Sequence, residues 1–181
     1  FKINDLIFSL KKRGHQITVL TGKPNYSKTH FFEGYGWKSD DFETINDIPV
    51  YRANLFSRRN GGAFRLFLNY ISFAFLAPLK VRKIKGSFDA IFVYQTSPVT
   101  VGIPAIFAKK LFKAPIYFWV QDLWPESLTA AGGVKNKLVL GFFNSLTKWI
   151  YYQSKKVLIQ SDGFREYILN QGIPNDKIIF Y

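Results

Sequence analysis

Short apolar runs alternate with helix-like segments along most of the chain, and this alternation constrains the fold more than any other feature. The strand-like runs are residues 16–21, 48–53, 88–94, 115–120, 156–160 and 177–180. The helix-like segments are residues 2–13, 99–112, 136–155 and 162–171. Apolar strands without polar alternation, separated by helices, are typical of a parallel sheet. We therefore predict an α/β, Rossmann-like parallel sheet with helices on both faces.

The remaining segments are less regular. Residues 22–47 are rich in Gly, Asn, Asp, Ser and aromatic side chains, and we predict a long irregular loop there. Residues 63–84 form a long apolar segment after two glycines. In a doubly wound sheet the strand before the first helix lies centrally, so we expect at least one strand to precede residue 1.

Composition narrows the chemistry. The chain has no cysteine, which excludes disulfide scaffolds and thiolate metal sites, and only two histidines, which disfavours a histidine-based metal site. The formal net charge is +13 and aromatic residues make up 18% of the sequence. Such a positive balance indicates an anionic partner, for which nucleic acid, anionic lipid and phosphate-bearing substrates are all candidates.

Polar or glycine-bearing loops follow four of the expected strands. They are residues 22–26 (GKPNY), 95–98 (QTSP), 121–127 (QDLWPES) and 161–164 (SDGF). Parallel sheets bind ligands outside the carboxyl ends of their strands, so we expect these loops to form the rim of a binding site.

The same segments carry a family resemblance. Residues 10–26, 93–105, 118–127 and 157–178 resemble, in the same order, the acceptor-side half of a retaining family-4 glycosyltransferase with the GT-B fold. They are most similar to transferases that assemble bacterial O-antigen, capsule or colanic-acid-type polysaccharides, including amino-sugar and fucosamine transferases. QDLWPES is the most specific of these motifs.

The resemblance implies that residues 1–181 are the N-terminal acceptor domain of a two-domain enzyme. It also implies that the first strand and the C-terminal nucleotide-sugar domain lie outside this sequence, so that the fragment alone is inactive. The donor would be a nucleotide-sugar, held mainly by the C-terminal domain, with no other cofactor and no bound metal. The acceptor would be a polyprenyl-diphosphate-linked or other sugar at the cytoplasmic face of the plasma membrane, where the enzyme would be peripheral.

Asp122 is the catalytic candidate. The resemblance places it where the family has a His or Asp beside the donor sugar, and a carboxylate there can orient hydroxyls and favour developing positive charge. The alternative is that Asp122 caps the following helix, with Trp124 and Pro125 as core and first-turn residues. Gln121 and Glu126 are substrate-binding candidates beside it, although a first-turn glutamate also complements a helix dipole.

The other loops supply further substrate-binding candidates. In residues 22–26 the candidates are Asn25 and Tyr26, which could bind an acceptor sugar or its phosphate. The alternative is that these residues form an ordinary turn without a binding role. At the next strand ends the candidates are Gln95, Thr96, Ser97 and Ser161. Helix capping is the alternative for Ser97 and for Asp162.

A basic segment surrounds the long apolar one. Residues 48–88 contain eight basic side chains and no acidic one. Apolar aromatic residues with flanking cations suit the surface of an anionic membrane. The residues expected to face the membrane are Arg58, Arg59, Arg65, Lys80, Arg82, Lys83 and Lys85. The alternative is a core helix with a solvated basic end.

These features favour a glycosyltransferase that moves a sugar with retention to a lipid-linked acceptor in bacterial surface polysaccharide synthesis. Two alternatives remain open, a nucleotide-sugar epimerase of GT-B fold and a non-catalytic membrane-docking module. A nucleic-acid-binding protein is disfavoured because many aromatic residues lie within apolar segments and no nucleic-acid motif occurs.

Overall fold

The computed structural model of the chain describes residues 2–25, 31–58, 62–132 and 134–181. The chain divides into two compact units, Phe1–Ile84 and Lys85–Tyr181, and each unit has a sheet of its own.

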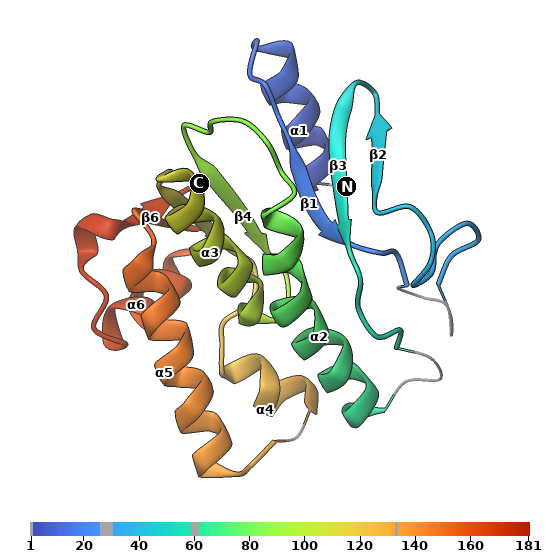
Figure 1. Cartoon of the computed structure of the whole chain (residues 1–181). Coiled ribbons are helices and arrows are strands. Elements are labelled where there is room, and N and C mark those ends of the chain that lie inside the picture. Colours follow the sequence, from blue (N-terminus) through green and yellow to red (C-terminus); the bar gives the residue numbers. More distant parts are fainter. Residues whose placement is uncertain (1, 26–30, 59–61, 133) are drawn as a thin grey trace. The chain divides into compact units, whose positions relative to one another are not determined.

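The first unit has a three-stranded mixed sheet. Its elements are α1 (Lys2–Lys12), β1 (Val19–Gly22), β2 (Phe42–Ile45), β3 (Ile48–Ala53) and α2 (Ala63–Val81). The strand order is β1-β3-β2, with β1 parallel and β2 antiparallel to β3 (Figure 1). Helix α2 packs against β1 and β3. Helix α1 covers nearly all of the helix-like segment 2–13 that the sequence predicted.

Strand β2 corrects the prediction that residues 22–47 form only an irregular loop. Asn46 and Asp47 adopt φ angles of 49° and 58°, the left-handed conformation that a two-residue hairpin turn requires. This turn returns the chain along β3, where Phe42 lies opposite Tyr51 with ring centroids 5.0 Å apart. Such cross-strand aromatic pairs stabilise short antiparallel strands.

The second unit has four parallel strands. Its elements are β4 (Ile91–Gln95), the 3₁₀ turn η1 (Val99–Val101), α3 (Gly102–Phe112), β5 (Ile116–Val120), α4 (Glu126–Gly132), α5 (Lys137–Gln153), β6 (Lys156–Ile159), α6 (Asp162–Asn170), η2 (Asn175–Lys177) and β7 (Ile178–Phe180). The strand order is β4-β5-β6-β7, and every neighbouring pair is parallel. This all-parallel sheet with flanking helices confirms the α/β, Rossmann-like fold.

The core of the second unit lies on one face of the sheet. Ile116, Phe118 and Val120 alternate along β5 and point into a cluster that also contains side chains of α3, α5 and α6. Helices α3, α5 and α6 all contribute side chains to this core. The strand order advances in one direction, and right-handed crossovers then place successive helices on the same side.

The opposite face of the sheet carries aromatic side chains. Tyr117 and Trp119 alternate with the core residues of β5, and Trp119 packs against Phe92, Tyr94 and Tyr181 with ring centroids 5.1 to 6.0 Å apart. Aromatic pairs at these separations stabilise beyond their buried area, by about 1 kcal/mol each. The two faces together therefore fix the position of β5 and of the loop that follows it.

Candidate functional site at the carboxyl ends of the strands

Three loops meet at the carboxyl edge of the four-stranded sheet. Gln95 ends β4, Gln121 and Asp122 follow β5, and Gln160 follows β6. The backbone N–H of Gln121 donates to the carbonyl of Gln95 at 2.9 Å, and Nε2 of Gln160 reaches the carbonyl of Gln121 at 3.4 Å. The structure therefore brings these strand-end loops side by side, as expected for a parallel sheet.

Asp122 is half-buried at this edge. Within the described part of the chain its carboxylate makes no hydrogen bond, and α4 begins only at Glu126, four residues later. The structure therefore gives no support to a helix-capping role for Asp122. Burial raises the pKa of the Asp122 carboxyl above its ordinary value, because desolvation disfavours the charged form. A carboxylate kept partly from water without an internal partner is typical of a functional position.

Gln95 lies differently from its neighbours. Its side chain is fully buried, with Nε2 donating to the carbonyl of Thr96 at 3.3 Å, and its Oε1 has no hydrogen-bond partner among the described residues. At the end of β4 the exposed side chain is that of Thr96, while Ser97 is half-buried before a cis peptide bond to Pro98. Thr96 is therefore the better placed of the three to meet a ligand.

Ser161 is exposed after β6, at the residue that precedes α6. Its side chain makes no capping hydrogen bond to that helix. Among the residues that the structure describes, the Ser161 hydroxyl has no hydrogen-bond partner, so it is available to a ligand.

The loop after β5 is held from the far side by α6. The carbonyl of Trp124 accepts a hydrogen bond from the Tyr167 hydroxyl and another from Nε2 of Gln171, both at 3.2 Å. Gln171 also donates to the Tyr167 hydroxyl at 2.9 Å. Burial, followed by a hydrogen bond from Tyr167 to Glu126 and the charge of that glutamate, raises the pKa of Tyr167. These contacts tie the Trp124–Pro125 turn, which has a cis peptide bond, to α6.

Sequence reasoning did not identify Tyr167 and Gln171. They lie more than forty residues from the loop that they hold, and their own segment reads only as an amphipathic helix. Only the pairing of β5 with β6 brings α6 to this loop.

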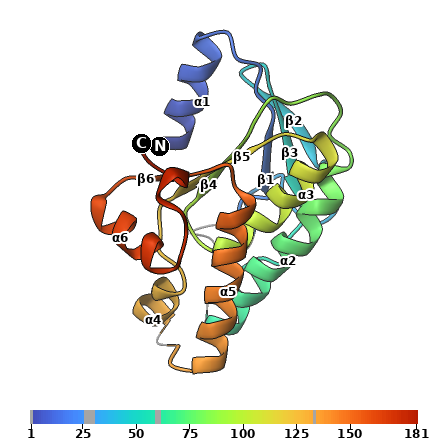
Figure 2. The same cartoon turned by 90° about the vertical axis from the view of Figure 1, so that its left-hand side faces the viewer.

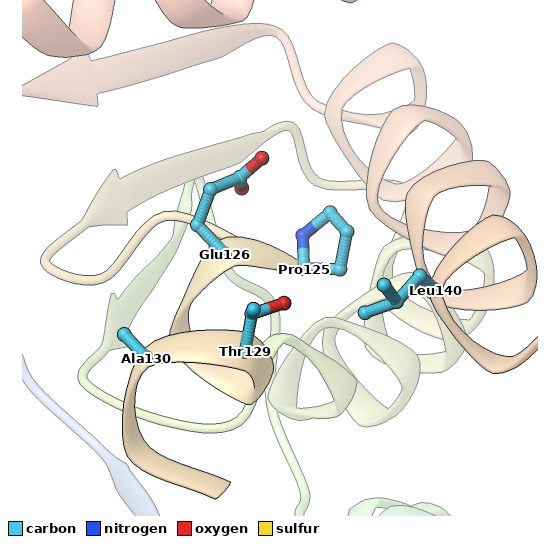
Figure 3. Close-up of a pocket in the computed structure, with 5 residues that line it drawn as sticks. All are labelled: Pro125, Glu126, Thr129, Ala130 and Leu140. Carbon is cyan, nitrogen blue, oxygen red and sulfur yellow. The ribbon is translucent and has the colours of Figure 1, made fainter. Parts of the chain in front are cut away.

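A pocket adjoins the same loop on the side of α5. It has a volume of about 380 Å³ and is lined by Pro125, Glu126, Thr129, Ala130 and Leu140 (Figure 3). Three of these five side chains are apolar, and Leu140 comes from the first turn of α5. Sequence reasoning singled out only Glu126 among them, because the pocket depends on how α4 and α5 pack.

Of the two substrate-binding candidates of the first unit, Asn25 and Tyr26, the structure describes only Asn25, and its side chain is not exposed. Asn25 is buried, where its amide donates to the carbonyl of Lys23 at 2.9 Å and accepts from Asn69 at 3.2 Å. Its side chain therefore links the end of β1 to α2. Tyr26 lies outside the described residues. Lys23 is also buried, and its ammonium donates to the carbonyls of Gly36 and Ser39.

The residues expected to face a membrane differ in how exposed their side chains are. Arg82, Lys83 and Lys85 are exposed, and Arg65 is half-buried. Arg58 is half-buried over the ring of Tyr70, 5.3 Å from its centroid. Arg59 lies outside the described residues.

Lys80 requires a correction. It is 7% exposed, and its ammonium pairs with the carboxylate of Asp41 inside the first unit. A buried, paired ammonium cannot reach a lipid headgroup, so we remove Lys80 from the predicted membrane-facing set.

The comparison with known families covers nearly the whole chain. Residues 2–180 match the family model described as a glycosyl transferase 4-like domain. No curated protein matches the chain.

Proposed function

Since the chain belongs to the family of glycosyl transferase 4-like domains, it is a glycosyltransferase domain, and we propose that the strand-end rim around Asp122 is its acceptor-side active site. The proposed reaction moves a sugar with retention from a nucleotide-sugar to a lipid-linked or polysaccharide-precursor acceptor. Its proposed place is bacterial surface polysaccharide synthesis of the O-antigen or capsule type. Gln121, Glu126, Thr96, Ser97 and Ser161 are the proposed substrate contacts.

The observation that carries this proposal is the carboxylate of Asp122. It is half-buried, makes no internal hydrogen bond in the described chain, and follows a strand whose position is fixed on both faces. Positive charge develops at the anomeric carbon when the bond to the nucleotide breaks, and a preorganised carboxylate stabilises such charge. In retaining transfer the departing phosphate can take the acceptor proton, so Asp122 orients sugar hydroxyls and stabilises charge without acting as the base.

The test uses full-length protein with membranes that contain lipid-linked acceptor and a panel of UDP- and GDP-sugars. Asp122→Asn keeps the shape of the side chain and removes its charge, and we expect kcat to fall about 100-fold. Asp89→Asn is the matched control, because Asp89 is an exposed aspartate that precedes β4 at the opposite edge of the sheet. Full activity in a folded Asp122→Asn variant would contradict the assignment, and a new sugar formed without acceptor would favour an epimerase.

We also propose that the protein is peripheral on the inner face of the plasma membrane, with part of α2 toward lipid. Phe64 and Phe75 of α2 are each about 70% exposed, and the exposed Arg82, Lys83 and Lys85 follow the helix. Among the described residues, Phe64–Val81 is long and apolar enough to cross a membrane by length and composition, and a third of it is buried. Core helices of soluble proteins share that property, so peripheral contact is the simpler proposal.

A further inference from the structure

Helix α5 is apolar on two opposite faces. Thr147, Ile150 and Tyr151 point into the core of the second unit and are buried. On the other side Leu138 is 84% exposed, Phe142 63% and Trp149 45%. Because these residues are four and seven positions apart, they lie on one face of the helix. A surface helix normally turns polar side chains outward, so this exposed apolar stripe requires an explanation.

The charged side chains of α5 and of the segments directly before and after it are all basic. Between Glu126 and Asp162 the sequence contains no acidic residue and five lysines. Lys135 and Lys137 are exposed next to the beginning of the stripe, and Lys148 is exposed beside Trp149. An apolar helix face that includes a tryptophan and is flanked by lysines is the pattern of helices that lie in the interface of an anionic bilayer.

The stripe begins at the carboxyl edge of the sheet. The chain leaves β5 at that edge, forms α4, and enters α5, which then runs back toward the start of β6; Figures 1 and 2 show the α4–α5 connection at one end of the unit. Leu140, two residues after Leu138, lines the pocket beside Pro125 and Glu126. The most exposed part of the stripe is therefore near the loop that carries Asp122.

We propose that the second unit docks on an anionic lipid bilayer through the outer face of α5, with Leu138, Phe142 and Trp149 inserted and Lys135 and Lys137 on the headgroups. This contact is separate from the one proposed for α2 and does not depend on the transfer reaction. If the proposed function also holds, docking through α5 brings an acceptor that is embedded in the bilayer to the strand-end rim.

Charge complementarity favours a bilayer over a second copy of the chain. In a two-fold dimer through α5 the same patch would face itself, and the lysines beside the stripe would meet their own copies. Like charges brought together in this way oppose association, whereas anionic headgroups supply the opposite charge.

The first experiment measures sedimentation of the full chain with vesicles of equal parts phosphatidylcholine and phosphatidylglycerol, without donor or acceptor. We expect the double substitution of Leu138→Ser with Phe142→Ser to weaken binding about tenfold or more, because both side chains leave hydrocarbon. Leu111→Ser is the control, since Leu111 of α3 is an exposed leucine outside the stripe. All the substituted positions are exposed, so the variants should fold, and circular dichroism will confirm this.

Three results would overturn the proposal. The first is wild-type protein that does not bind these vesicles, and the second is a double variant that binds as well as the wild type. In the second case, a loss of binding in Phe75→Ser would assign docking to α2 instead. The third is a protein that dimerises through the stripe, with Phe142→Ser abolishing the dimer and leaving vesicle binding unchanged.

A second measurement tests insertion directly. Brominated lipids quench tryptophan fluorescence only at short range, so wild-type protein should be quenched on vesicles and Trp149→Phe should lose most of that quenching. Equal quenching in both proteins would contradict insertion of the stripe. Asp122→Asn should bind vesicles as the wild type does, so that failure of docking and failure of the transfer assignment give different results.

Discussion

The carboxyl group of Asp122 is half-buried, and in the described chain it has no hydrogen bond to offset its desolvation. Its pKa in the folded protein is therefore above the value of 3.8 that it has in an unfolded chain. Between these two pKa values the unfolded chain ionises first, so stability falls as the pH rises through that window. At neutral pH the ionised carboxylate opposes folding.

We therefore expect Asp122→Asn to raise the free energy of unfolding at neutral pH. The gain should shrink as the pH falls through the raised pKa of the folded state and should be lost below the unfolded value of 3.8, where the carboxyl is protonated in both states. Urea unfolding of both proteins from about pH 4 to 8 measures this, with Asp89→Asn as a control for the change in net charge. If Asp122 were a helix cap, the substitution would instead lower stability or leave it unchanged, because asparagine also caps helices.

Single residues differ in how far the sequence could place them. The positions of Gln121 and Asp122 followed from local pattern, because an apolar strand that ends in polar residues marks its own carboxyl end. The surroundings of Gln95 and Asn25 did not follow. The burial of Gln95 depends on packing, and Asn25 is bonded to Asn69, 44 residues away. Lys80 was misplaced for the same reason, since its partner Asp41 lies in a distant loop.

Among the elements, α6 has the most direct influence on the loop that carries Asp122. The Tyr167 hydroxyl and Nε2 of Gln171 both donate to the carbonyl of Trp124. We expect Tyr167→Phe to lower the free energy of unfolding by about 1 kcal/mol, the value of a typical hydrogen bond. We also expect transfer to slow through kcat, because the loop loses one of the two donors that position it.

The matched control for this substitution is Tyr152→Phe. Tyr152 lies on α5, and its hydroxyl donates to the carbonyl of Gly172 at 2.7 Å and not to the carbonyl of Trp124. Its loss should reduce stability similarly while kcat with detergent-solubilised acceptor stays at the wild-type value. Equal kcat in the two variants would show that α6 supports the fold without positioning the loop.

Among the elements, the sequence predicted most strands and helices but gave no bounds for strand β2 or helix α4. Strand β3 has the predicted bounds, because Ile48–Ala53 is a β-rich run between polar segments. Strand β2 was missed, because its four residues alternate weakly and the Asn46-Asp47 turn was read as part of a loop. The separation into two units could not be predicted either, since no linker composition marks the boundary at Ile84.

The net charge of +13 belongs to the whole molecule, and an anionic bilayer and duplex DNA are two surfaces that it could bind. The two differ in how binding responds to salt. Binding to DNA is almost entirely electrostatic and falls steeply as counterions compete. Docking through the α5 stripe also buries Leu138 and Phe142, and this apolar contribution is not screened.

We therefore expect that random-sequence duplex DNA, added in charge excess at about 0.15 M salt, will not displace the protein from phosphatidylglycerol vesicles. Raising the salt to about 1 M should weaken vesicle binding without abolishing it, because screening reaches the lysines and not the buried apolar side chains. In the double variant of Leu138 and Phe142 the residual binding at high salt should disappear. If DNA displaces the protein and binding to both vesicles and DNA falls steeply with salt, the positive charge of this protein instead functions in binding nucleic acid.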